Sequence, residues 1–467
     1  MSDIALEPGS FRDRTARVFY HDGKILRGLN ETALAEWQAL SATTFFRRFS
    51  GTGAIVPTRQ RDIASVPFTA SEPQWAGVLE HERLPFVSYP YEWSFEMLRD
   101  AALLQLDLVL AGLEEGIGLK DASAYNVQWK GVSPVFVDVA SFYKRTEGEP
   151  WVGYRQFCQM FLYPLLLQAY RDVPFQPWMR GNIDGMDAEV CLNLLSARDY
   201  LRGGVLAHVY LQAKAQKAYN STTRDVRADL NKAGFDKRII KANAERLRAL
   251  VAGLEWKPKQ STWSDYLKCG HYEASDAAQK RDFVRSVAAA REWGLAWDIG
   301  CNVGVFSRIV AERAKSVVAM DADHLAIDKL YRALKSERVP NILPLIVNVT
   351  DPSPNLGWRN MERKRINERG NPDLVLALAL IHHVVIGGNI PLAEFVQWLR
   401  DLGGDLVIEF VTRKDPMVVT LLRNKDDHYA DYDEQVFERE LAARFSVVRR
   451  EPLSSGTRIM YYAQLPH

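Results

Sequence analysis

The sequence feature that most constrains the fold is the segment at residues 295–307, LAWDIGCNVGVFS. It begins with an apolar run typical of a buried strand, passes through two glycines and continues as the start of a helix. Gly300 and Gly304 stand where the backbone must turn sharply and where a ligand can approach without meeting a Cβ atom. This order predicts the first strand, turn and helix of an α/β sheet with a ligand at the turn.

The residues of this turn narrow the class of ligand. A dinucleotide site requires G-x-G-x-x-G, but Asn302 and Val305 occupy the second and third glycine positions. A phosphate-binding loop requires Gly-Lys-Ser/Thr, which this segment lacks. The motif is D-x-G-x-N-x-G, with Asp298 on the strand and no cationic side chain in the turn. It favours a positively charged ligand without phosphates, and S-adenosylmethionine is such a ligand.

Further strands are predicted downstream, each as an apolar run. They cover residues 316–321, 342–348, 373–379 and 405–411, and two antiparallel strands are expected at 445–448 and 458–462. Asp321 ends the second strand about twenty residues after the turn, where a ribose-binding carboxylate belongs in a βαβ nucleotide site. Asp351 follows the third strand and supplies a polar group beside the adenine position.

This ordered series resembles the class I S-adenosylmethionine-dependent methyltransferases over roughly residues 260–467. The residues that carry the resemblance are Asp298, Gly300, Asn302, Gly304, Asp321 and Asp351. The resemblance implies a Rossmann-like domain with a mostly parallel seven-stranded sheet and S-adenosylmethionine as cofactor. Asp298 and the carbonyls near Ala379 would orient the methionine end of the cofactor. Asp321 would accept hydrogen bonds from the ribose hydroxyls, and Asp351 from the adenine amino group. A Rossmann-like fold without a ligand is the alternative.

Two histidines follow the fourth strand, at the carboxyl end where open α/β sheets bind their ligands. Methyl transfer mainly requires alignment of the reacting atoms and exclusion of water, but an amine or hydroxyl acceptor also needs a base. His382 or His383 is the candidate base, with the other packing or capping, and a purely structural role for both is the alternative. Tyr266, His271 and Tyr272, ahead of the first strand, either close over the cofactor or pack a helix.

The N-terminal half is predicted to be α+β. Residues 16–29 predict a hairpin with Asp22-Gly23 as its turn. Asn30 and Ser94 are expected to cap the first turns of two helices, the second long and amphipathic and ending before residue 116. Residues 50–75 predict a loop, and strands are expected near 75–79 and 84–89.

A second polar pattern lies in this half, at Asp121, Asn126 and Asp138. An Asp, an Asn five residues later and another Asp after two short strands resemble the catalytic and metal-binding loops of the protein-kinase-like fold. The resemblance implies Asp121 as base, with Asn126 and Asp138 holding magnesium. The sequence departs from the kinase pattern because it lacks a glycine-rich phosphate loop and a Val-Ala-Ile-Lys motif, and Lys24 is the single early strand lysine. The alternative is that these side chains cap turns.

Composition limits the remaining possibilities. With 59 Lys and Arg against 58 Asp and Glu, the net charge of +1 gives no reason to expect nucleic acid as the main partner. A basic helix at 236–253 could bind an anionic partner, although a solvated helix face is the commoner explanation. The sequence shows no signal peptide, membrane-spanning run or paired cysteine motif, so a cytoplasmic location is expected and no structural metal.

The whole layout resembles a bacterial family that includes rhizobial host-specific nodulation proteins. The sequence therefore predicts two domains, an acceptor-recognising domain at residues 1–255 and a methyltransferase domain at 256–467. The expected function is methyl transfer to an unidentified small-molecule or glycan-related acceptor. The alternatives are a bifunctional kinase-like and methyltransferase protein, or a non-catalytic binding protein with a vestigial site. The sequence does not indicate the oligomeric state.

Overall fold

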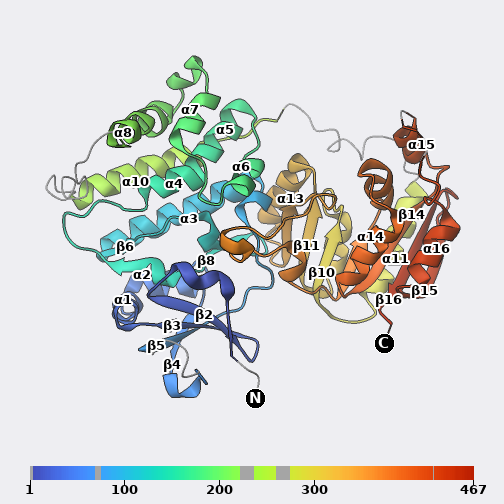
Figure 1. Ribbon diagram of the computed structural model, residues 1–467, viewed down its shortest axis with the longest axis horizontal. Helices are drawn as coiled ribbons and strands as arrows, with labels where there is room; N and C mark the ends of the chain where they lie inside the picture. Colours follow the sequence, from blue (N-terminus) through green and yellow to red (C-terminus); the bar gives the residue numbers. More distant parts are fainter. Residues whose placement is uncertain are drawn as a thin grey trace.

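The structure is a computed structural model that describes residues 4–68, 75–220, 236–258, 274–423, 425–426 and 428–466. Figure 1 shows two halves side by side along the longest axis, the N-terminal half in blue to green and the C-terminal half in yellow to red. The predicted boundary near residue 255 falls between α10 (Lys237–Ala252) and α11 (Ala274–Ala288). The predicted cluster of Tyr266, His271 and Tyr272 lies outside the described residues.

In the described part of the chain, the C-terminal half is built on one sheet of seven strands. In spatial order these are β12 (Ile342–Ile346), β11 (Ala314–Asp321), β10 (Trp293–Ile299), β13 (Leu374–Ala377), β14 (Asp405–Val411), β16 (Arg458–Gln464) and β15 (Ser446–Pro452). The first five are parallel, and β16 and β15 are antiparallel to their neighbours. Each strand lies on a segment where the sequence predicts one. Because the strand order reverses at β10, the carboxyl ends of β10 and β13 form the crevice where such sheets bind ligands.

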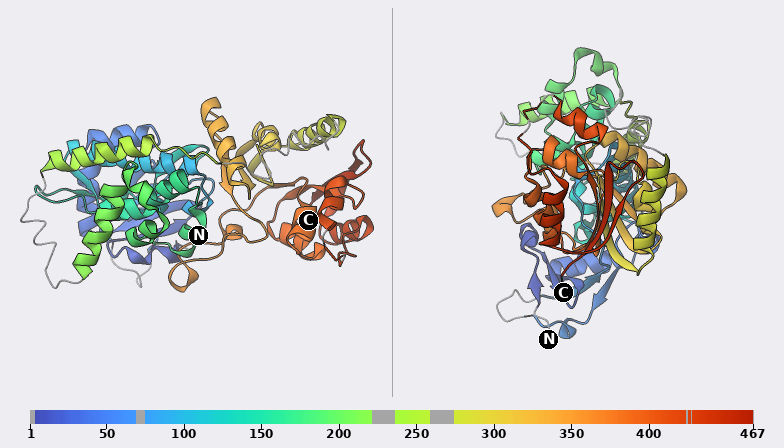
Figure 2. Two further views of the ribbon diagram at one scale, coloured as in Figure 1. Left: turned by 90° about the horizontal axis from the view of Figure 1, so that it is seen from above. Right: turned by 90° about the vertical axis from the view of Figure 1, so that its right-hand side faces the viewer.

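Helices lie on both faces of this sheet (Figure 2). They are α11, α12 (Val305–Ala311), α13 (His324–Glu337), α14 (Leu392–Asp401), α15 (Pro416–Leu422) and α16 (Glu434–Ala442). Every residue of β13 and β14 is buried, as expected for central strands covered on both faces.

The N-terminal half begins with a five-stranded antiparallel sheet. Its spatial order is β1 (Ala5–Leu6), β2 (Ala16–His21), β3 (Lys24–Leu29), β5 (Gly77–His81) and β4 (Thr58–Arg61). The predicted hairpin is confirmed, with Asp22 at φ 48° and Gly23 at φ 72° in its turn. The prediction of a loop over residues 50–75 missed β4, whose four residues are polar and none of them buried. The prediction of a strand at 84–89 is wrong, because this described segment runs without a ladder partner and buries Phe86 against Trp297.

The predicted caps are confirmed in two helices of this half. Asn30 caps α1 (Glu31–Ser41) by accepting from the backbone N–H of Ala33, and Ser94 caps the long helix α3 (Phe95–Glu114). Two short strand pairs follow α3, β6 (Ile117–Leu119) with β9 (Phe142–Lys144) and β7 (Val127–Lys130) with β8 (Ser133–Phe136). The other helices are α2 (Thr44–Gly51), α4 (Tyr154–Phe157), α5 (Tyr163–Arg171), α6 (Gln176–Gly181), α7 (Ala188–Leu194), α8 (Leu211–Asn220) and α10.

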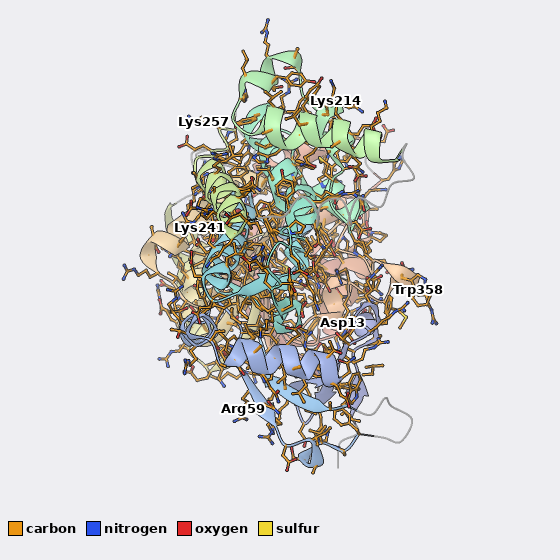
Figure 3. The ribbon with its side chains drawn as sticks, turned by 90° about the vertical axis from the view of Figure 1, so that its left-hand side faces the viewer. Asp13, Arg59, Lys214, Lys241, Lys257 and Trp358 are labelled. Atoms are coloured by element: carbon orange, nitrogen blue, oxygen red, sulfur yellow. The ribbon has the colours of Figure 1, made fainter. Side chains whose placement is uncertain are left out.

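The basic helix predicted at 236–253 is α10, which packs along α3. Its Lys237 and Lys241 both bind the carboxylate of Glu114, at 3.0 and 2.8 Å. Figure 3 shows Lys241 among the side chains of this outer face of the molecule. These two lysines therefore pair with a neighbouring helix. Among the described helices, none has both the length and the apolar character needed to cross a membrane.

One continuous cluster of buried apolar side chains extends through both halves. Where α3 meets α13, the hydroxyl of Tyr331 donates to the Asp100 carboxylate at 2.5 Å and Lys335 also binds Asp100. Nearby, a Cβ atom on Gly131 would lie 2.2 Å from the carbonyl oxygen of Pro340, so the two backbones approach too closely for any other residue. The two halves therefore pack as one body with a shared core.

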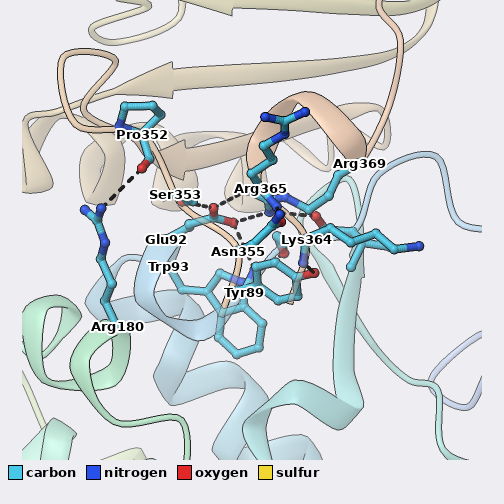
Figure 4. A network of polar contacts seen from close by, with 12 residues as sticks. Tyr89, Glu92, Trp93, Arg180, Pro352, Ser353, Asn355, Lys364, Arg365 and Arg369 are labelled. Carbon is cyan, nitrogen blue, oxygen red and sulfur yellow. Dashed lines mark hydrogen bonds and ion pairs between the residues drawn. The ribbon is translucent and has the colours of Figure 1, made fainter. Parts of the chain in front are cut away.

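A second connection is the segment at residues 351–369, between β12 and β13, which we call the strap. It leaves the C-terminal sheet and lies against the N-terminal half (Figure 1). At its C-terminal end Arg369 forms an ion pair with Glu92, at 2.7 and 2.5 Å, in which each side chain is only 1% exposed (Figure 4). Ser353 also donates to Glu92, and the backbone N–H of Lys364 donates to the Tyr89 hydroxyl at 2.8 Å.

The strap also reaches the connection between β1 and β2 in the N-terminal half. Both carboxylate oxygens of Glu362 accept from Arg12, at 2.6 and 2.7 Å, and Lys364 pairs with Glu7 at 2.5 Å. Trp358, at the tip of the strap, is 57% exposed and projects at the edge of the molecule (Figure 3). The strap thus contacts the N-terminal sheet and the entry to α3 at once.

We expect loss of one partner of the Arg369–Glu92 pair to destabilise the protein strongly. Arg369→Met leaves the Glu92 carboxylate buried without its charged partner, which should lower the free energy of unfolding by about 3–5 kcal/mol in urea denaturation. The control is Arg365→Ala, which removes an exposed pair with Glu368 in the same strap and should change the free energy by less than about 1 kcal/mol. Equal unfolding midpoints for wild type and Arg369→Met would show that the pair does not hold the strap.

Candidate active site

The glycine turn after β10 has the geometry that its sequence predicts. Gly300, Asn302 and Gly304 have φ values of 81°, 49° and 77°, all in the left-handed region. The backbone N–H groups of Gly300 and Cys301 both donate to the carbonyl of Met320 on β11, at 2.8 and 2.9 Å. The turn is therefore anchored to the end of the neighbouring strand.

Asp321, at the end of β11, points toward this turn. Its Oδ2 accepts from the backbone N–H of Asn302 at 2.8 Å, and its Oδ1 accepts from that of Asp323 at 2.9 Å. Burial raises the pKa of Asp321, and the two backbone donors oppose this rise. The structure thus brings the predicted ribose-binding carboxylate together with the glycine turn.

Asp298 lies near the end of β10, on the strand that the sequence predicts. It is only 2% exposed, and its Oδ2 accepts from the hydroxyl of Ser307 in α12 at 2.5 Å. Burial raises its pKa from 3.8 to about 6. In this structure Asp298 joins the end of β10 to the first turns of α12, and its direct contact with a cofactor stays a prediction.

The end of β13 faces the glycine turn from across the crevice. A Cβ atom on Gly300 would lie 3.3 Å from Leu380 Cδ1 and 3.9 Å from the carbonyl oxygen of Leu378. Between them, Ala379 is a non-glycine residue at φ 49°, and its backbone N–H donates to Glu409 Oε2 at 2.8 Å. Ala379 and Leu380 are partly exposed, and this turn lies against Gly300 where the carboxyl ends of β10 and β13 meet.

The two histidines differ in accessibility. His382 is 0% exposed, and burial, then His383, Arg458 and Lys280, lower its pKa well below the usual value. His383 is partly exposed, and burial followed by the Arg458 charge lowers its pKa to about 4. Their ring centroids are 4.1 Å apart. Both imidazoles are therefore neutral at physiological pH, but His383 is the accessible one.

Asp351 connects the two halves of the protein. Its two carboxylate oxygens accept from Arg180 of α6, each at 2.9 Å, and Figure 4 shows Arg180 reaching the start of the strap. The sequence predicts a contact with adenine instead. To contact adenine, the Asp351 carboxylate would have to break its bonds to Arg180, or accept from the adenine amino group and Arg180 together.

Sequence analysis missed a buried charged group beside the histidines. Glu409 of β14 binds Lys280 of α11 at 2.5 Å and Arg458 of β16 at 3.1 Å, and Arg458 also binds Asp415 at 2.7 Å. Glu409 lies within a predicted strand, but Lys280 and Arg458 are distant in sequence and carry no motif. Only the folded chain brings them together.

The second predicted polar pattern also converges. Burial and the nearby Asp138 carboxylate raise the pKa of Asp121, and Asn126 lies close enough to oppose that rise. Asp121 Oδ1 also accepts from the backbone N–H of Ser123 at 3.0 Å, as the turn-capping alternative expects. Asp138 pairs with Arg27 of β3 at 2.7 Å, a residue that sequence analysis did not select. In the described residues no three His, Cys, Asp or Glu side chains gather as metal ligands.

Comparison with known proteins places both halves in context. No protein-family model matches the chain. Over 464 residues, 97% of this chain and 94% of the relative, the sequence is 34% identical to the nodulation protein NoeA of Rhizobium meliloti (strain 1021).

Solved structures show weaker likeness. The N-methyltransferase NodS from Bradyrhizobium japonicum WM9 is 12% identical, with a TM-score of 0.31 over 42% of this chain and 99% of that chain. Magnesium protoporphyrin IX methyltransferase (ChlM) from Synechocystis PCC 6803 is 15% identical, with a TM-score of 0.30 over 45% of this chain and 90% of that chain. Scores this low do not decide the fold or the site.

The raised pKa of Asp298 makes a prediction about stability. The Asp298 carboxyl ionises near pH 3.8 in the unfolded chain but only near pH 6 in the folded protein. The free energy of unfolding therefore falls as the pH rises from about 3.8 to about 6, and the full loss is present above that range. We expect Asp298→Asn to raise the free energy of unfolding by up to about 3 kcal/mol near pH 8 and to change it little near pH 4.

The matched variant is Ser307→Ala, which removes the hydrogen bond that lowers the pKa of Asp298. It should destabilise the protein near pH 8, the opposite sign, and both effects are measured by urea denaturation across this pH range. A destabilised Asp298→Asn protein near pH 8 would contradict the assignment of a costly buried charge.

Proposed function

The chain belongs to the family of the nodulation protein NoeA, and from this premise we propose that it is an S-adenosylmethionine-dependent methyltransferase. The proposed acceptor is a small-molecule or glycan-related compound, and the proposed role is in host-specific nodulation. The observation that carries the proposal is the crevice between β10 and β13, where three left-handed residues and the Asp321 carboxylate meet.

The residues of the crevice fit this cofactor. Gly300 has no Cβ atom at φ 81°, so a nucleoside can approach its backbone closely. At Gly304 a Cβ atom would lie 2.7 Å from Leu330 Cδ1, so this glycine allows α13 to pack against the turn. Asp321 offers carboxylate lone pairs to the ribose hydroxyls while its bonds to Asn302 and Asp323 hold it in place. We infer that the turn around Ala379 lies beside the methionine end.

When bound, the cofactor supplies a methyl group on a sulfonium that is already a good leaving group. The protein then has to align the acceptor with that methyl group, exclude water and accept a proton. We propose that His383 accepts this proton, because it is partly exposed and neutral, and that the buried His382 supports it. The lowered pKa makes His383 a weak base. A weak base is sufficient for an acceptor atom that becomes acidic as its bond to the methyl carbon forms.

For the N-terminal half we propose acceptor recognition and a kinase-like fold. The fold proposal is supported by the antiparallel sheet, the helix α1 directly after β3, and the convergence of Asp121, Asn126 and Asp138. A bifunctional protein is the second candidate, and it requires Asp138 to exchange Arg27 for a metal ion. Metal-dependent ATP binding that is lost in Asp138→Ala would support it. A cytoplasmic location remains part of the proposal.

Calorimetry with S-adenosylmethionine tests the proposed function. Asp321→Ala removes the carboxylate that would bind both ribose hydroxyls, so we expect at least a tenfold loss of affinity, which corresponds to about 1.4 kcal/mol. The control is Asp282→Ala, an exposed carboxylate of α11 that should leave the affinity unchanged. Failure of the wild-type protein to bind, or equal affinity of wild type and Asp321→Ala, would rule the proposal out in favour of a vestigial site.

The acceptor is identified by incubating the protein and labelled cofactor with extracts of its source cells and isolating what gains the methyl group. With that acceptor, His383→Ala should lower kcat by about 10²–10⁴-fold, the usual contribution of a general base, with little change in cofactor affinity. The pH profile of wild-type kcat should stay level from pH 8 to about 5 and fall as His383 protonates near its pKa of about 4. An unchanged kcat in His383→Ala would assign the proton transfer elsewhere.

A further inference from the structure

Four charged side chains lie buried together beside the proposed active site. They come from four different elements or their ends: Lys280 of α11, Glu409 of β14, Asp415 before α15 and Arg458 of β16. Their side chains are between 0% and 4% exposed. Two positive and two negative groups therefore lie together in this buried group.

The contacts run in a chain from one helix to the next. Glu409 Oε1 accepts from Lys280 Nζ at 2.5 Å and from Arg458 Nη1 at 3.1 Å. Arg458 also donates to both oxygens of Asp415, at 2.7 and 3.2 Å, and Asp415 caps α15 through the backbone N–H of Met417. Glu409 is thus held from two sides and cannot change its position without separating buried charges.

The second oxygen of Glu409 reaches the active-site wall. Its Oε2 accepts from the backbone N–H of Ala379 at 2.8 Å, and Ala379 has φ 49°. A non-glycine residue in the left-handed region costs about 1–2 kcal/mol, so surrounding contacts must hold it there. The Glu409 carboxylate is a contact of this kind.

The turn that Glu409 holds is placed where methyl transfer would occur. Leu378 and Leu380, on either side of Ala379, are the residues nearest to the Cβ direction of Gly300. His382 and His383 follow within four residues. A shift of this turn would therefore move the wall of the cofactor crevice and the proposed base together.

We propose that Glu409 is a positioning residue for methyl transfer. Its carboxylate, held by Lys280 and Arg458, fixes the left-handed turn at Ala379 and so sets the distance between the cofactor crevice and His383. This inference rests on the proposed function, and it adds a requirement that the cofactor motif does not contain. A buried ion pair is weak support for stability, because well-packed apolar residues often replace one without loss. The pair can therefore be removed without removing the fold.

The test compares two double variants with matched packing. Lys280→Met with Glu409→Gln removes the ion pair but leaves an amide oxygen to accept from Ala379, and should bind S-adenosylmethionine within about threefold of wild type. Lys280→Met with Glu409→Leu removes that acceptor as well, and should bind at least tenfold more weakly. The remote control, Glu292→Gln with Arg313→Met, removes an exposed ion pair and should match wild type.

A third variant distinguishes positioning from packing. Glycine adopts the left-handed region without strain, so adding Ala379→Gly to the Lys280→Met, Glu409→Leu protein should recover most of the lost affinity. Circular dichroism melting checks that each variant is folded. If the double variants do not fold, Ala379→Val in the otherwise wild-type chain replaces them. A β-branched residue resists this φ, so affinity should again fall at least tenfold.

The outcomes separate the two proposals. Suppose that the wild-type protein binds S-adenosylmethionine and that the folded Lys280→Met, Glu409→Leu protein, or Ala379→Val, binds it with the same affinity. This result would overturn the positioning role and leave the proposed function intact. Weak binding that Ala379→Gly does not restore would assign the charged group to packing alone. A wild-type protein that does not bind S-adenosylmethionine would overturn both.

Discussion

The hydrogen bond from the backbone of Asn302 to the carboxylate of Asp321 joins the carboxyl ends of β10 and β11, and the crevice depends on it. The sheet itself does not set the conformation of the loops at the carboxyl ends of its strands. Hydrogen bonds between neighbouring strand ends therefore decide whether these loops form a binding site. Here the bond fixes a left-handed turn without Cβ atoms at its two glycines and directs a carboxylate toward it. Both properties are needed before a nucleoside without phosphates can be recognised.

The opposite wall of the crevice is held by a different means. Ala379 keeps a left-handed conformation, and the carboxylate that supports it is Glu409 of the neighbouring strand β14, part of a buried group of charges. Strained, over-determined backbone of this kind is typical of functional sites. One wall is therefore set by glycine and a strand-end carboxylate, and the other by tertiary contacts.

The strap gives the N-terminal half a structural part in this arrangement. It leaves the sheet beside β12, on the cofactor edge, and ends in the buried Arg369–Glu92 pair before β13 begins. The loop that would border the adenine of the proposed cofactor is thus attached to the N-terminal half, and Asp351 itself binds Arg180. An acceptor bound to the N-terminal half would therefore be bound to a part of the protein that packs directly against the C-terminal domain.

The sequence by itself determined the strands of the C-terminal sheet, the glycine turn and the place of Asp321, because apolar periodicity and a short local motif encode them. It also determined the hairpin at Asp22 and the caps at Asn30 and Ser94, which depend on neighbouring residues alone. Only the tertiary structure decided that Asp298 faces Ser307, that Asp351 faces Arg180, and that Lys280 and Arg458 meet at Glu409. These are pairings between residues far apart in the chain, and the partner of a charged side chain is set by packing, which no local pattern records.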